Sequence, residues 1–328
     1  MNLGNNKVLK ILKEIFLTIT RFFAEPFKIL KSKDLNFCYR EAISWIKNNT
    51  IKDEGIVITS KVVKSYPEVT GYLIPTLIDA KEFELAKQYA DFLVSVQRPN
   101  GAFAGPDGRE YVFDAGQALR GLVAASQKWD YFKLSAIKTA DYIVSCTEDN
   151  GKIPAIYNGA PSENIHVFVL PALMQASRVF GIQKYADSAK KSALYYKSVP
   201  NILNENTMIH FLAYILDGFI DLGQKEFVYE TVKKIFSRQN LNGKINAYPN
   251  VNWSCSTGVA QLAIIAYKLG LKGEGDRALE YMCNLQNFSG GFFGSYGLMA
   301  RYFRSEEISW ANKFFIDAVI LKKIINKN

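Results

Sequence analysis

The chain has 328 residues, 48% hydrophobic and 22% charged, which excludes a disordered or low-complexity protein. The net charge is +9, but residues 1–40 hold eight Lys/Arg against three Asp/Glu, so the remaining body is only mildly basic and nucleic-acid binding is not expected. The four cysteines form no CxxC pair and only two histidines are present. We therefore expect no metal site, no cofactor and a reducing, cytoplasmic location.

The first predicted element is an amphipathic helix over residues 7–31, in which apolar residues recur at helical spacing until Pro26 ends or kinks the pattern. Charges interrupt it every few residues, so it is not a transmembrane segment. Two interpretations stay open. The helix lies on an anionic membrane surface, peripheral at the inner membrane, or it packs on the body with its lysines in water. We divide the chain into this arm, residues 1–40, and a body, residues 41–328.

The body is predicted to be a repeat. Four helical patterns each end in a polar turn with a glycine, and Gly101, Gly151, Gly243 and Gly290 are 50, 92 and 47 residues apart. The interval of 92 is two periods of 46, so a degenerate unit is expected near residues 198–200. An earlier unit ends at Gly55, which makes six units.

A second helical pattern, rich in Ala, Gly and Leu, follows each turn. These patterns cover residues 67–80, 113–126, 163–177, 206–222, 253–270 and 307–323. They are nearly free of charge past their first turns, so they are expected to be buried, whereas the helices before the glycines are amphipathic. The prediction is an all-α fold, an (α/α)6 toroid or six-hairpin barrel with an inner and an outer ring. The alternative is an open α-solenoid.

Residues 97–103 and 286–292 fit the pattern QxxxGxF, with Gln97 and Gln286 first and Gly101 and Gly290 fifth. These turns resemble the QW-type repeats of the terpenoid cyclase and protein prenyltransferase toroids over about residues 41–323, which implies the same architecture. The motifs DxDD and DDxxD and an Asp/Cys/His zinc set are missing, which argues against terpene chemistry. The segment FDAGQALRGL also resembles inner helices of carbohydrate-active six-hairpin enzymes, where Asp-x-Gly begins such a helix.

Inner helices of a closed ring all begin at one end, so polar residues in their first turns converge on a funnel. The candidate catalytic residues are Asp114, Glu68, Glu163, His166 and His210. Each also has a structural explanation, as a helix cap or a first-turn charge. We expect Asp114 to be an N-cap that the helix dipole keeps ionised, and Glu68 or Glu163 to be the more desolvated proton donor.

Aromatic rings stack on the apolar faces of pyranoses, while sugar hydroxyls need polar partners. The candidate substrate-binding residues are Tyr66, Tyr72, Phe103, Tyr111, Gln117, Trp253, Tyr296, Arg304, Glu307 and Trp310.

The favoured function is a carbohydrate-active enzyme that hydrolyses, cleaves or epimerises a polysaccharide or lipid-linked glycan by acid/base chemistry. Hydrolysis needs two carboxyl groups about 5–5.5 Å apart for retention or about 6.5–9.5 Å apart for inversion. Elimination or epimerisation beside a uronate needs a base such as His or Tyr, and an Arg for the carboxylate. The alternatives are a toroid that binds a glycan or protein without catalysis and, less favoured, a terpenoid cyclase or prenyltransferase.

Overall fold

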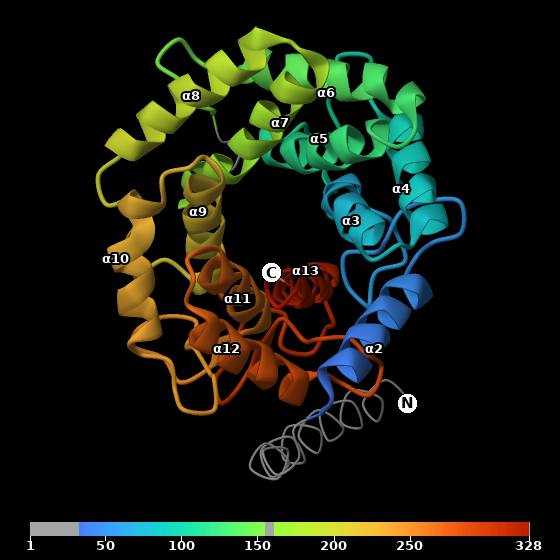
Figure 1. Cartoon of the computed structure of the whole chain (residues 1–328). Helices are drawn as coiled ribbons and strands as arrows, with labels where there is room; N and C mark the ends of the chain where they lie inside the picture. The colour runs from blue at the N-terminus through green and yellow to red at the C-terminus, as the bar shows by residue number, and fades with distance from the viewer. Residues whose placement is uncertain (1–32, 155–160, 328) are drawn as a thin grey trace, which may run out of the picture.

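A computed structural model of the chain describes residues 33–154 and 161–327, and side chains from residue 164 on in the second range. The described part contains twelve α-helices in two concentric rings (Figure 1). The outer ring consists of α2 (Leu35–Asn48), α4 (Phe83–Val96), α6 (Lys133–Cys146), α8 (Gln183–Ser198), α10 (Lys225–Phe236) and α12 (Lys272–Leu285). The inner ring consists of α3 (Pro67–Asp79), α5 (Val112–Ser126), α7 (Leu170–Phe180), α9 (Ile209–Asp221), α11 (Ser256–Lys268) and α13 (Ser309–Ile325). The predicted (α/α)6 toroid is confirmed.

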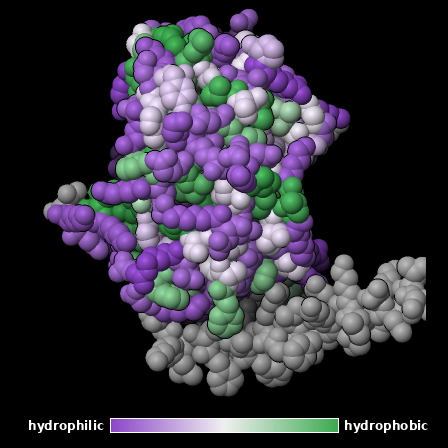
Figure 2. Space-filling model, turned by 90° about the vertical axis from the view of Figure 1, so that its right-hand side faces the viewer, coloured by the Kyte–Doolittle hydropathy of each residue, from purple (hydrophilic) through white to green (hydrophobic). Residues whose placement is uncertain are grey.

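The two rings differ in burial as their sequences predict. Residues Ser256–Tyr267 of α11 are all buried, whereas α10 buries only one face. Seen from the side of α4, the outer surface is mainly hydrophilic with separate hydrophobic groups (Figure 2). None of the helices in the described ranges is long and apolar enough to span a bilayer.

The remaining elements are short. They are the 3₁₀ helices η1 (Asp130–Phe132) and η2 (Pro161–Val169) and the antiparallel strands β1 (Ser254–Cys255) and β2 (Ser295–Tyr296). The third inner pattern, predicted as one helix over 163–177, is therefore divided between η2 and α7. Pro171 explains the division, because proline lacks the N–H of an α-helical ladder and disfavours α geometry in the residue before it.

The ring is closed by direct contacts between its first and last units. Helix α13 packs on α2, α3 and α11. The backbone N–H of Ser309 donates to the carbonyl of Ile58 at 3.1 Å, and the indole N–H of Trp45 donates to Glu307 at 2.7 Å. These contacts exclude the open α-solenoid, whose terminal units would lie far apart.

The glutamine of each QxxxGxF turn connects neighbouring outer helices. The Gln97 amide donates to the carbonyl of Ser135 in α6 at 2.9 Å. Gln286 does the same to Cys38 in α2 at 2.8 Å, and also donates to its own turn at Gly290. The main partner of this amide is therefore the next outer helix along the ring.

The turn glycines make the same connection by close approach. Gly290 has a φ of +86°, and a Cβ there would lie 2.2 Å from the carbonyl oxygen of Glu41 in α2. Gly101, Gly151 and Gly243 press on backbone carbonyls of the following outer helices in the same way. In the degenerate fourth unit Asn201 takes the left-handed conformation, with φ of 57°.

We predict that Gly290→Ala destabilises the ring far more than Gly181→Ala. Both glycines have positive φ, which costs alanine about 1–2 kcal/mol, but a Cβ at Gly181 meets no atom within 4 Å. The collision at Gly290 should add about 1–3 kcal/mol to the loss of unfolding free energy. Denaturant unfolding of both variants measures the difference. Equal losses would show that the contact with α2 does not constrain the ring.

Candidate active site

The site begins with an unusually close approach of α3 and α5. A Cβ on Gly71 would lie 2.6 Å from the Cα of Ala118, and one on Gly121 would lie 2.3 Å from the carbonyl oxygen of Gly71. Small residues therefore let the two inner helices touch through their backbones. The close packing brings their first turns together, with Glu68 on α3 and Asp114 on α5.

The carboxyl groups of Glu68 and Asp114 interact electrostatically. Burial raises the pKa of Glu68 well above its usual value, and the charge of Asp114 raises it further. Asp114 is 3% exposed, and burial raises its pKa to about 7 even though a hydrogen bond from the Tyr66 hydroxyl lowers it. Glu68 keeps some accessible surface. Both shifts favour the neutral carboxyl, so the pair binds protons at a higher pH than free Asp and Glu side chains do.

This arrangement corrects two expectations about Asp114. The N-cap of α5 is Tyr111, and Asp114 is the third residue of the helix, with its carboxylate turned to Tyr66 of the neighbouring unit. The helix dipole does not keep it fully ionised, because burial has the larger effect on its pKa. The expectation that Glu68 or Glu163 is the proton donor stays a prediction, and burial raises the pKa of Glu68 in the direction that this role needs.

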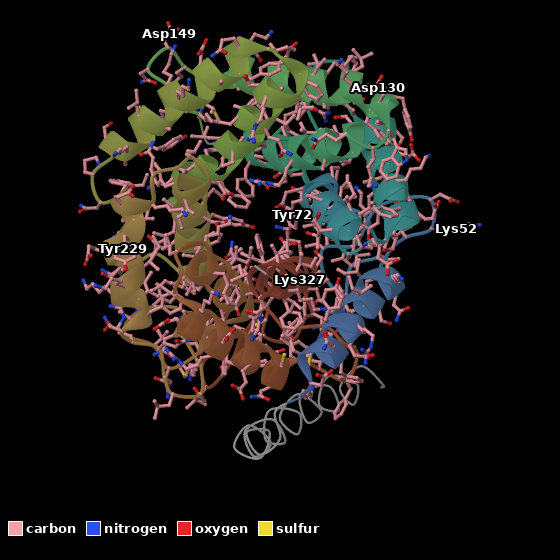
Figure 3. The ribbon with its side chains drawn as sticks, viewed as in Figure 1. Lys52, Tyr72, Asp130, Asp149, Tyr229 and Lys327 are labelled. Carbon is pink, nitrogen blue, oxygen red and sulfur yellow. The ribbon has the colours of Figure 1, made fainter. Side chains whose placement is uncertain are left out.

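Aromatic rings fill the centre of the ring next to the carboxyl pair. The ring centroids of Phe168 and Tyr214 are 4.7 Å apart, those of Tyr214 and Phe314 are 5.8 Å apart, and Tyr72 lies 6.0 Å from Phe314. Figure 3 shows Tyr72 on the inner side of α3, whereas Tyr229 lies outside the ring. Burial and the charge of Glu68 both raise the pKa of Tyr72 and of Tyr214, so these aromatic rings lie beside the acid.

Both histidines are buried, and His210 joins the aromatic side of the site. Its Nδ1 faces the amide oxygen of Gln261 at 2.8 Å, so Nδ1 carries the hydrogen and Nε2 the lone pair. Burial lowers the pKa of His210 to about 4, which keeps the imidazole neutral. Its ring packs 4.8 Å from Tyr214 and 5.8 Å from Tyr302. His166 is buried in η2, and the side chain of Glu163 lies outside the described residues.

Several predicted binding residues are structural instead. Phe103 has no accessible surface and belongs to the core. Gln117 is buried, and its amide N–H donates to the backbone carbonyl of Phe113 in the same helix. Glu307 accepts hydrogen bonds from Trp45, Asn287 and Ser289 and so closes the ring. Phe103 and Glu307 thus have roles within the fold, whereas the amide oxygen of Gln117 is buried without a hydrogen-bond partner in the described part of the chain.

Other predicted residues lie around the same end of the ring. Tyr111 is buried, and its hydroxyl donates to the Asp107 carboxylate. The hydroxyl of Tyr296 in β2 accepts from the Phe293 N–H at 2.8 Å. Arg304 is exposed, and it lines a cavity of about 550 Å³. Trp253 and Trp310 are buried, with Trp310 packed on Tyr302 at 6.4 Å.

Tyr214 and Tyr302 belong to the same group of aromatic rings, although neither was predicted as a site residue. Tyr214 lies one helical turn after His210, which is the signal that could have identified it. Tyr302 lies in the long loop before α13, where no periodicity applies. Arg120 of α5 donates to the Phe168 carbonyl at 2.8 Å, and its guanidinium lies 4.4 Å from the centre of that ring.

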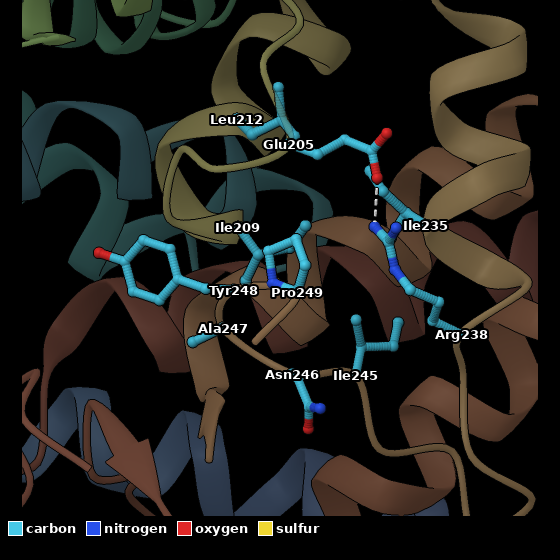
Figure 4. Close-up of a pocket in the computed structure, with 10 residues that line it drawn as sticks. All are labelled: Glu205, Ile209, Leu212, Ile235, Arg238, Ile245, Asn246, Ala247, Tyr248 and Pro249. Atoms are coloured by element: carbon cyan, nitrogen blue, oxygen red, sulfur yellow. Dashed lines mark hydrogen bonds and ion pairs between the residues drawn. The ribbon is translucent and has the colours of Figure 1, made fainter. Parts of the chain in front are cut away.

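Two pockets differ in what they could hold. The one in Figure 4 has a volume of about 30 Å³, room for a water or two, and lies beside the ion pair of Glu205 and Arg238. A cavity of about 890 Å³ lies beside Tyr302 and is large enough for part of a substrate. Within the described ranges, no three His, Cys, Asp or Glu side chains cluster closely enough to hold a metal ion.

Comparisons with solved structures give the same fold. An unsaturated glucuronyl hydrolase specific for heparin shares 13% identity at a TM-score of 0.72, covering 90% of this chain and 98% of that one. An alpha-amylase from Clostridium perfringens shares 17% identity at a TM-score of 0.66, covering 87% of this chain and 97% of that one. An unsaturated glucuronyl hydrolase from Bacillus sp. GL1 shares 14% identity at a TM-score of 0.64, covering 87% of this chain and 94% of that one.

These likenesses support the resemblance to carbohydrate-active six-hairpin enzymes and give no support to the one with terpenoid cyclases. No protein-family model matches the sequence, and no curated protein does.

We predict that Asp114→Asn removes a pH dependence of stability. Because the folded-state pKa of about 7 lies above the ordinary 3.8, the native state binds more protons between these values and the unfolding free energy falls as pH rises through this window. Relative to that of the wild type, the unfolding free energy of the variant should therefore rise by roughly 2–4 kcal/mol between pH 4.5 and 7.5, as measured by urea unfolding.

Asp149→Asn, at an exposed aspartate in the turn before Gly151, is the control for an Asp-to-Asn change away from the site. Parallel stability curves for wild type and Asp114→Asn would contradict the raised pKa.

Proposed function

We propose that the chain is a carbohydrate-active enzyme that hydrolyses glycosidic bonds, with Glu68 as general acid and Asp114 as base or nucleophile. The observation that carries this proposal is the pair of buried, electrostatically coupled carboxyl groups at the start of α3 and α5. A raised pKa suits an acid that protonates the leaving oxygen, and a carboxylate that ionises near neutrality suits its partner. Tyr66 holds the Asp114 carboxylate in place.

Hydrolysis fits the site better than elimination or epimerisation. The pKa of Tyr72, Tyr214 and Tyr302 is raised well above the usual value by burial, which makes these phenols poor bases. The carboxyl pair supplies both an acid and a base without them.

The substrate class follows from the surroundings of the pair. Tyr302, which lines the cavity of about 890 Å³, offers aromatic surface on which a pyranose ring can stack. The solved structures of similar fold include hydrolases of unsaturated glucuronyl groups and an amylase, so uronate-containing and neutral glycans are the substrates to test first.

We predict that Glu68→Gln and Asp114→Asn each lower kcat by about 10²–10⁴-fold on a glycan that the wild type cleaves, while the fold is kept. The assay incubates the full chain with neutral and uronate-containing oligosaccharides. Products are followed by mass, by absorbance of an unsaturated uronate and by deuterium uptake at C5, which separates hydrolysis, elimination and epimerisation.

Glu84→Gln, at an exposed first-turn acid of α4, is the matched control and should retain full turnover. Full activity in both site variants, or deuterium uptake without cleavage, would rule out the proposed hydrolysis by this pair.

We further propose that residues 7–31, which lie outside the described residues, bind an anionic membrane surface. The support is the sequence, a wide apolar stripe beside lysines in a segment whose surrounding residues 1–40 hold eight Lys/Arg against three Asp/Glu. The body needs Lys33, whose ammonium donates to the Gln286 carbonyl at 2.8 Å, so a truncation should begin there.

We predict that deleting residues 1–32 leaves the melting transition of the body intact and abolishes sedimentation with phosphatidylglycerol vesicles. The full chain should release these vesicles as salt rises, because screening weakens attraction to anionic lipid. Phosphatidylcholine vesicles are the control. Loss of the melting transition on truncation would show that the arm is part of the core.

A further inference from the structure

Two loops lie side by side at the end of the ring where the inner helices begin. They are residues 59–66 before α3 and residues 297–308 before α13. The backbone N–H of Ser60 donates to the carbonyl of Glu307 at 2.9 Å, and the Lys61 ammonium donates to the hydroxyl of Ser305 at 3.2 Å. The two loops therefore form one surface across the junction of the first and last units.

Every exposed side chain of residues 61–64 and 298–304 is apolar or basic. We call these exposed side chains the rim. Val63 is 93% exposed, and Leu298 and Met299 are each 67% exposed. Neighbouring apolar side chains left in water, with charged residues around them, are typical of an interaction surface.

The basic residues of the rim have few acidic neighbours. Neither segment of the rim contains Asp or Glu. Of the two acids that follow, Glu306 accepts from the Thr59 hydroxyl at 2.8 Å, and Glu307 is used in ring closure. Glu54 lies at the edge, where it accepts from the Ser65 hydroxyl at 2.5 Å. The rim is therefore a locally positive surface with apolar side chains at its tips.

This combination matches an anionic bilayer better than a soluble polyanion. Apolar side chains enter the boundary between headgroups and acyl chains, while Lys and Arg attract anionic headgroups. An acidic polysaccharide would pair with the cations but leave Val63, Leu298 and Met299 in water. Only the bilayer uses both kinds of side chain.

We propose that the rim is a membrane-docking surface, which binds anionic phospholipid and turns this end of the ring toward the bilayer. Stable anchoring of a peripheral protein takes two signals. Membrane binding was proposed above for residues 7–31, and the rim strengthens the binding that they begin. The evidence for the rim comes from the body alone, so the two proposals can fail separately.

The first test measures the partition constant of the full chain on phosphatidylglycerol vesicles. Each Lys or Arg beside an anionic surface contributes about fivefold to this constant. The rim-charge variant, Lys64→Gln with Arg301→Gln and Arg304→Gln, should therefore bind at least tenfold more weakly than the wild type.

A matched control separates this contact from a general loss of net charge. It is Lys138→Gln with Lys190→Gln and Lys191→Gln, which removes the same number of charges from exposed lysines of α6 and α8. Because these helices belong to the outer ring, the control should bind within about threefold of the wild type.

The second test removes apolar surface and keeps every charge. Val63→Ser with Leu298→Ser should weaken partition at least fivefold, because both side chains leave water on docking. The matched control is Leu134→Ser with Leu194→Ser, at leucines 63% and 69% exposed on α6 and α8, which should leave partition unchanged. All four side chains are exposed, so the melting transition should be kept in both variants.

The third test measures orientation with a polarity-sensitive fluorophore on Val63→Cys, in a Cys146→Ser background, because the other three cysteines are buried. Its emission should shift to the blue when phosphatidylglycerol vesicles are added. The control label on Ile324→Cys, 51% exposed at the opposite end of α13, should not shift.

Equal partition of the rim-charge variant and its control would overturn the proposal, as would a blue shift at Ile324→Cys without one at Val63→Cys. Loss of binding in the charge variant alone, with the apolar variant unaffected, would show instead a surface for an acidic polysaccharide. Binding that depends on residues 1–32 but on no rim residue would leave only the arm as a membrane anchor. Binding that survives deletion of these residues and is lost in both rim variants would support the rim and contradict the arm.

Discussion

Each turn glycine of the QxxxGxF type lies against a backbone carbonyl of the next outer helix, and the rest of the ring depends on this contact. At Gly290 the neighbouring carbonyl belongs to Glu41 of the first outer helix, so the same contact that repeats around the ring also closes it. The amide of Gln286 strengthens that junction by donating to Cys38 and Gly290. Because side-chain amide and glycine act together, the spacing between helices is fixed by backbone geometry, with little freedom for side-chain repacking.

Closure determines what the inner ring can do. The inner helices α3 and α5 touch through Gly71, Ala118 and Gly121. This packing places Glu68 and Asp114 in an environment where ionisation is unfavourable, and their raised pKa values are the result. Burying two carboxyl groups weakens the fold above neutral pH. That cost is typical of catalytic carboxyl pairs, in which the shifted pKa is what makes proton transfer efficient.

The sequence was sufficient to predict the repeat, the closed ring and the end of the ring that holds the site, because glycine spacing and apolar periodicity are local signals. It also predicted that Glu68 and Asp114 lie close together, since first-turn acids of adjacent inner helices must converge. The partners of individual side chains could not be predicted. Asp114 accepts a hydrogen bond from Tyr66 instead of capping its helix, and Glu307 accepts one from Trp45 where the ring closes. Such outcomes depend on contacts between distant segments, and Tyr302 lies in a loop that carries no periodic pattern.

The central claim is that two carboxyl groups in the mouth of the ring titrate far above their ordinary range. Carbon-13 NMR of the side-chain carboxyls, with Glu and Asp labelled and resonances assigned through Glu68→Gln and Asp114→Asn, measures this directly. The account predicts that the Asp114 resonance titrates near pH 7 and that Glu68 remains protonated well above pH 4.5. Titration of both groups near pH 4 would contradict it, because neither could then hold a proton for catalysis at neutral pH.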